Sequence, residues 1–201
     1  MKPEDKVFRV WVGILVLTDE IWKYVAITKA YKRITAENSC ASKSADFLDV
    51  AFQAIWDQLL LDISKIFDRA RTCGNENCSI DLLKELIQES VSFSEAEKEI
   101  INQEADRLCE NFDKIISRDM RNKQIAHYDL ESLLNNAEKE IPSEELEAFV
   151  VSVAGFLSNI STRFLNERGS IRFYSLEGTI KKYEDDMRKI YESNKKLHDG
   201  F

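Results

Sequence analysis

Glycine and proline are scarce in this chain of 201 residues, which contains six glycines and two prolines. Average usage would supply roughly 24 of these residues in the same length. Sheet-rich folds reverse direction often, and their turns depend on glycine and proline. The scarcity therefore excludes a fold of many short strands and favours few, long elements, as in an all-α protein.

The sequence also lacks the short motifs of several large enzyme classes. No two glycines lie within four residues of each other, so no glycine-rich loop is available to cradle a phosphate. Neither a His-Glu-x-x-His zinc motif nor a Gly-x-Ser-x-Gly nucleophile turn is present. We therefore expect no cofactor.

The four cysteines are too few for a disulfide scaffold. Cys73 and Cys78 lie close in sequence and suggest a zinc site, but a structural zinc ion needs four ligands. Cys40 and Cys109 are isolated, and the chain has only two histidines. We predict free thiols and no metal site.

Basic charge is in deficit, with 28 Lys and Arg against 36 Asp and Glu, a net charge of −8. This excludes the overall basic surface typical of nucleic-acid-binding proteins, but a local basic site remains possible. The apolar stretch at 7–17 is interrupted by Arg9 and is shorter than the ~20 residues of a membrane span. It also lacks a signal-peptide cleavage site, so we expect a soluble cytoplasmic protein with no membrane partner.

Apolar residues recur with the spacing of amphipathic helices along most of the chain. Ser79 is a candidate cap for one short helix, and Ser94–Glu97 has the pattern of a capping box that opens a longer one. The pattern predicts helices over about 5–35, 48–67, 80–91, 95–116, 129–140, 143–164 and 176–190, with a loop at 69–79 and an extended link at 169–175. We predict a single helical bundle of about six main helices, formed by residues 1–170, with a C-terminal helix in 171–201 docked on the same domain.

One polar segment, residues 118–129, interrupts the helical pattern and contains His127. The span 111–128 has a net charge of +2, whereas 129–149 has −6, so the segment is a basic island in an acidic chain. Two interpretations are open. In the first, Arg121 and Lys123 lie at a helix C-terminus, where cations are favoured, and His127 is a polar residue before a helix cap. In the second, the segment forms a functional site.

The block Arg121-Asn122-x-x-x-x-His127 resembles the signature of the HEPN superfamily (higher eukaryotes and prokaryotes nucleotide-binding), an Arg, a polar residue and a His several residues later. The closer resemblance is to the AbiU-type abortive-infection branch. In that branch a helix ending like Leu61–Asp68 precedes an Arg-Asn-Lys-x-x-Ala-His-x-Asp block, which here spans Arg121–Asp129. The resemblance in helix order covers roughly residues 1–170.

The resemblance implies a HEPN-like bundle acting as a metal-independent endoribonuclease or toxin in phage defence. It further implies a homodimer with facing motifs, an RNA substrate, and an antitoxin or other regulatory partner. Arg121 and His127 would be catalytic: an imidazole transfers protons near neutral pH, and a guanidinium clamps a phosphate. Asn122 and Lys123 would support them.

Two alternatives remain: a non-catalytic HEPN-like module that binds a partner protein or a nucleotide, and an unrelated helical protein. On a continuous helix, six steps of ~100° leave Arg121 and His127 about 120° apart and ~9 Å apart along the axis. The two side chains would not share a face. Either the helix breaks between them, or the working pair is assembled across a two-fold axis.

Overall fold

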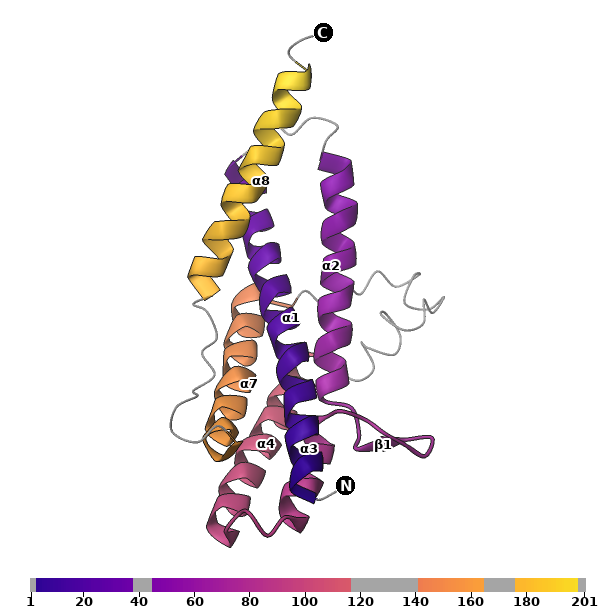
Figure 1. Cartoon of the computed structure of the whole chain (residues 1–201). Coiled ribbons are helices and arrows are strands. Elements are labelled where there is room, and N and C mark those ends of the chain that lie inside the picture. Colours follow the sequence, from indigo (N-terminus) through magenta and orange to yellow (C-terminus); the bar gives the residue numbers. More distant parts are fainter. Residues whose placement is uncertain (1–2, 38–44, 117–140, 165–175, 199–201) are drawn as a thin grey trace. The chain divides into compact units, whose positions relative to one another are not determined.

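The computed structural model describes residues 3–37, 45–116, 141–164 and 176–198, and these form an all-α fold (Figure 1). The helices are α1 (Pro3–Glu37), α2 (Ala45–Ile66), α3 (Ile80–Glu89), α4 (Glu95–Ile115), α7 (Ser143–Phe164) and α8 (Leu176–His198). A short antiparallel hairpin, β1 (Arg71–Thr72) and β2 (Asn75–Glu76), joins α2 to α3. The predicted fold class is confirmed. The helix predicted at 129–140 and the link at 169–175 lie outside the described residues.

Side-chain caps define two of the helix starts, as the sequence predicts. The Ser79 side chain accepts a hydrogen bond from the Leu82 backbone N–H at the start of α3. At the start of α4, Ser94 accepts from the Glu97 N–H while the Glu97 carboxylate accepts from the Ser94 N–H. Each cap satisfies donors that would otherwise lack partners in the first helical turn.

The hairpin differs from the plain loop predicted at 69–79. Cys73 and Gly74, at its tip, both have positive φ, 51° and 84°. Two consecutive residues of this kind make the tight turn whose twist matches a two-stranded ribbon. The sequence did not predict this turn, because Asn or Gly is more usual than Cys at the position of Cys73.

The chain divides into two compact units. The first comprises Met1–Asp19 and Leu60–Arg172, and the second Glu20–Leu59 and Phe173–Phe201. Helices α1 and α2 contribute residues to both. The boundary predicted near residue 170 and the single-domain organisation stay predictions.

In the first unit, α4 packs beside α3 and α7. Its buried side chains Ile101, Ala105, Leu108 and Phe112 follow the predicted stripe. The stripe predicted for α7 is also buried, from Leu146 to Ile160. Trp11 of α1 is buried, and its Nε1–H donates to the Leu157 carbonyl at 3.0 Å, which ties α1 to α7.

In the second unit, Tyr31 of α1 stacks on Phe52 of α2 with ring centroids 4.5 Å apart. Leu176 and Ile180 at the start of α8 are buried, whereas Ile190 near its end is 49% exposed. In the first half of α2, Val50 is 70% exposed. Among the α2 side chains that the structure describes, the fully buried ones lie in the second half of the helix and include Ile63 and Ile66, which belong to the first unit.

No helix in the described part of the chain combines the length and the apolar character needed to cross a membrane.

Candidate functional site

The residues predicted to act, Arg121, Asn122, Lys123 and His127, lie outside the described residues. The structure does describe the elements on either side of them. α4 ends where the Ile116 N–H donates to the Phe112 carbonyl at 2.7 Å, and Ile116 is fully buried. The chain is next described at Ile141, which is also buried, before Pro142 leads into α7. Both flanks of the motif segment are thus anchored in the core of the first unit.

Three phenylalanines support these two flanks. Phe67 follows α2, Phe112 lies in the last turns of α4, and Phe149 lies in the first half of α7. The rings of Phe67 and Phe112 stack with centroids 4.7 Å apart, and Phe149 lies 5.3 Å from Phe67 and 6.4 Å from Phe112. Aromatic pairs at such separations add to the stabilisation from burial alone. This cluster fixes where the chain leaves α4 and where it enters α7.

Asp62 is a residue that the sequence pattern did not single out. Its side chain is only 6% exposed and accepts a 2.6 Å hydrogen bond from Lys65 Nζ, one turn further along α2. A buried carboxylate is costly unless it is paired, so the Lys65 contact is needed there. In the sequence, Asp62 stands between the apolar residues Leu61 and Ile63, four residues before Ile66.

Asp68, the last residue of the Leu61–Asp68 segment, lies two residues after the end of α2. Its backbone N–H donates to the Lys65 carbonyl at 3.3 Å, and its side chain is half-buried. This agrees with a structural role at the helix end. None of the side chains that the structure describes is a histidine.

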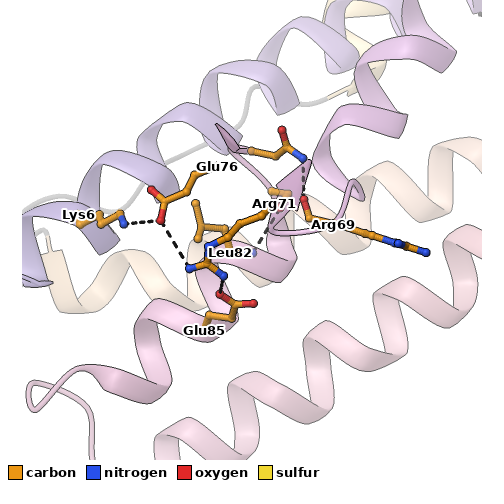
Figure 2. A network of polar contacts seen from close by, with 8 residues as sticks. Lys6, Arg69, Arg71, Glu76, Leu82 and Glu85 are labelled. Carbon is orange, nitrogen blue, oxygen red and sulfur yellow. Dashed lines mark hydrogen bonds and ion pairs between the residues drawn. The ribbon is translucent and has the colours of Figure 1, made fainter. Parts of the chain in front are cut away.

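The hairpin that carries Cys73 and Cys78 is held by an exposed polar network (Figure 2). Glu76 of β2 accepts a hydrogen bond from Lys6 Nζ of α1 at 2.7 Å, and its Oε1 lies 3.6 Å from Arg71 Nη2. Arg71 Nη1 also forms an ion pair with Glu85 Oε2 of α3 at 2.5 Å. The pKa of Glu76 is lowered, chiefly by the hydrogen bond from Lys6. Figure 2 shows the Arg69 side chain directed away from this network. The network therefore holds the hairpin to α1 and α3.

The hairpin register separates the two thiols. Arg71 pairs with Glu76 and Thr72 with Asn75, so Cys73 lies at the tip while Cys78 lies beyond the base. Four residue steps along the ribbon correspond to about 13 Å, too far for a disulfide. The Cys78 thiol instead donates to the Val10 carbonyl at 3.3 Å, and burial raises its pKa. Within the described ranges, no three His, Cys, Asp or Glu side chains gather as a possible metal site.

Comparison with protein families matches the AbiU2 model of the HEPN group over residues 19–189, a span that includes the Arg121–His127 block. No curated protein and no solved structure matches the chain. The family match covers most of the chain and agrees with the all-α architecture. The chain therefore belongs to the AbiU2 family of HEPN proteins, a family named for abortive infection.

Proposed function

We propose that this protein is a metal-independent endoribonuclease of phage defence. It would act as a cytoplasmic homodimer on RNA, under the control of an antitoxin or another regulatory partner. The observation that carries the proposal is the AbiU2 match across 19–189, which contains the HEPN-type block at Arg121–His127.

The residue types suit the reaction. RNA carries its own nucleophile, the 2′-hydroxyl, so cleavage needs proton transfer and stabilisation of the charge that develops on the phosphate. His127 would transfer the proton, and the Arg121 guanidinium would bind the phosphate in two-point fashion. Asn122 would orient the histidine or donate to the phosphate, and Lys123 would add positive potential.

The way in which the motif segment is anchored supports the proposal. The segment with the motif begins and ends at buried residues, Ile116 and Ile141, on elements joined by the Phe67, Phe112 and Phe149 cluster. Catalytic groups work best when rigid elements hold their supports. A net charge of −8 opposes general RNA binding, so substrate contact would be confined to the basic island at 111–128.

The direct test is incubation of the purified protein with total RNA in the presence of a chelator. We expect cleavage by the wild type and a loss of ~10²–10³ in rate for His127→Ala and for Arg121→Ala, the usual cost of a lost transition-state charge contact. Asn122→Ala and Lys123→Ala should have smaller effects. His198→Ala is the matched control and should cleave like the wild type.

Thermal unfolding of each variant separates catalysis from stability, and midpoints near the wild-type value are expected. Full cleavage by His127→Ala would refute the assignment of the proton-transfer group.

A second candidate function, a non-catalytic HEPN-like module that binds a partner protein or a nucleotide, is favoured by the acidic total charge. Wild-type dimer that leaves varied RNAs intact would support this second candidate.

A further inference from the structure

A row of side chains along α4 borders α7 within the first unit. Its members lie three or four residues apart and therefore share one face of the helix: Ile100, Glu104, Arg107 and Asn111. They line two adjoining hollows of about 440 and about 240 Å³, which have Glu104 of α4 and Asn159 of α7 in common. The polarity of this α4 row changes from one end to the other.

The first end of the α4 row is apolar. Ile100 is 57% exposed, and the hollow beside it is lined by the buried side chains of Ile101 and Ile160. A flat apolar group that covers Ile100 would remove this surface from water, which is favourable. This end therefore suits an uncharged, largely apolar part of a ligand.

The middle of the α4 row offers a hydrogen-bond acceptor. The Glu104 carboxylate accepts from the Asn159 side-chain amide of α7, at 3.4 Å to each oxygen. An ionised carboxylate has about four acceptor positions, so this contact leaves acceptor capacity for hydroxyl groups of a ligand. Carboxylates bind the hydroxyls of ribose in this way at dinucleotide sites.

The other end of the α4 row carries a guanidinium and an amide. Glu104 precedes Arg107 by three residues, a spacing that favours an ion pair, yet its carboxylate is bonded to Asn159 instead. Within the described ranges, the side chains of Arg107 and Asn111 form no hydrogen bond or ion pair. A guanidinium presents parallel N–H donors that match the oxygens of a phosphate, and the amide adds a further donor.

Gly155 of α7 keeps the second hollow open. It lies in the interior of the helix, where glycine is less favourable than alanine by about 0.5–1 kcal/mol. No atom lies within 4 Å of the position that a β-carbon would take, so packing within the described part of the chain does not require glycine here. Leu108 and Phe156, which also line this hollow, are buried. A glycine in such a wall lets a ligand approach the backbone closely.

We infer that the α4 row binds one ribonucleotide unit. The base covers Ile100, and the ribose hydroxyls donate to Glu104. The phosphate accepts from Arg107 and Asn111. The order apolar, acceptor, cation along the helix matches the order base, ribose, phosphate along a nucleotide, and Ile100 and Arg107 are about 10 Å apart along the axis.

The ribonucleotide unit belongs either to an RNA strand or to a free nucleotide, because both present the same three groups. The site extends nucleotide contact one turn of α4 beyond the basic island at 111–128. The inference concerns binding, and it does not depend on cleavage by the Arg121–His127 block.

The test measures binding with the full-length protein and two kinds of probe. Mixed-sequence hexamers of RNA and of the same sequence in DNA are titrated into His127→Ala protein, which should not cut them. Adenosine 5′-monophosphate and its 2′-deoxy form are titrated into the wild type. We expect at least one ribo probe to bind, and to bind at least fivefold more tightly than its deoxy form, because the 2′-hydroxyl is a partner of Glu104. Tight binding of the hexamer alone would identify RNA as the source, and tight binding of the monophosphate a free nucleotide.

Variants locate the binding. Arg107→Gln removes the phosphate contact and Gly155→Leu fills the hollow, and each should weaken binding at least tenfold. Glu104→Ala should reduce the preference for the ribo form to less than twofold. Arg9→Gln, at an exposed arginine of α1 outside the α4 row, is the matched control and should bind like its parent protein. If Gly155→Leu does not fold, Arg107→Gln decides.

Three results would overturn the inference: no binding of any ribo probe, equal affinity for ribo and deoxy forms, or an Arg107→Gln protein that binds as tightly as Arg9→Gln. The RNA cleavage assay separates this outcome from the proposed function. Cleavage by the wild type together with one of these three results would leave the nuclease proposal standing without this site. Binding that depends on Arg107, in a wild type that cleaves no RNA, would leave the site standing alone.

Discussion

Gly13 and Gly155 both lie within helices, and a methyl group has opposite consequences at the two positions. At Gly13 a β-carbon would overlap Cys78 Sγ and would lie 3.7 Å from Cys78 Cβ, an ordinary contact. The conflict is therefore with the sulfur alone. At Gly155 the same atom meets open space.

We predict that Gly13→Ala lowers the free energy of unfolding by about 1 kcal/mol, the lower end of the ~1–3 kcal/mol cost of an added methyl group, because the exposed Cys78 side chain must move to admit it. Gly155→Ala should raise it by about 0.5–1 kcal/mol, because alanine is the better helix former. Urea denaturation of the two variants measures both changes.

A double-mutant cycle tests the cause. In a Cys78→Ala background the overlap is gone, so Gly13→Ala should become stabilising by about 0.5–1 kcal/mol. Destabilisation of the same size with and without the sulfur would show that another contact is responsible.

At the scale of a single element, the start of α4 depends on its cap. The Ser94 hydroxyl accepts from the Glu97 N–H and the Glu97 carboxylate accepts from the Ser94 N–H at 2.8 Å, so two donors of the first turn are satisfied. Loss of either partner exposes a donor that the helix itself cannot pair.

Ser94→Ala should lower the free energy of unfolding by about 1 kcal/mol, within the usual range for removal of an N-cap. Ser92→Ala, two residues earlier in the same connection, is the control and should change it by less than about 0.5 kcal/mol. The comparison uses chemical denaturation at neutral pH. Equal effects of the two substitutions would argue against the cap.

α8 is held to α1 within the second unit by ion pairs. Arg33 donates to both oxygens of Glu177, at 2.8 and 3.2 Å, and to Glu184 at 3.0 Å. The hydrogen bond from Arg33 is the main reason that the pKa of Glu177 lies below its ordinary value of 4.5. A carboxyl with a lowered pKa stabilises the folded state above its ordinary value and loses this contribution as the pH falls through the lowered one.

Arg33→Ala should therefore reduce the hydrogen-exchange protection of α8 amides at pH 7 and leave α4 and α7 unchanged. Acidification through the lowered pKa of Glu177 should bring wild-type α8 toward the protection of the variant, since protonated Glu177 no longer attracts Arg33. Arg9→Ala, an exposed arginine of the first unit, should leave α8 unaffected. An α8 whose protection is unchanged in Arg33→Ala would contradict this role.

At the scale of the whole molecule, the proposed homodimer raises the question of which protomer supplies each catalytic group. Either the helix breaks between Arg121 and His127, or it leaves them about 120° apart, and in the second case a site would take its arginine from one protomer and its histidine from the other. The two copies would then form two composite sites.

To test this arrangement, the inactive Arg121→Ala and His127→Ala proteins are mixed, unfolded and refolded together. About half of the dimers would be mixed, and each would hold one intact composite site, so activity should return to about a quarter of the wild-type rate. A mixture as inactive as its components would place both groups in the same protomer. Sedimentation of the refolded mixture verifies that it is dimeric.

Local sequence determined much of this fold. The Ser79 and Ser94 caps, the start of α7 after Pro142 and the apolar stripes of α4 and α7 all act between residues within a few positions of one another. The scarcity of glycine and proline excluded a fold of many short strands for a similarly local reason. The Arg121–His127 block is also local, and the family match over 19–189 includes it.

Contacts between distant residues were decided by tertiary structure alone. The joining of Phe67, Phe112 and Phe149 and the meeting of Gly13 with Cys78 each involve elements far apart in the chain. Sequence periodicity shows which face of a helix is apolar but not which helix covers it. The identity of the covering helix depends on packing between whole elements, and the buried anchors of the motif segment arise from that packing.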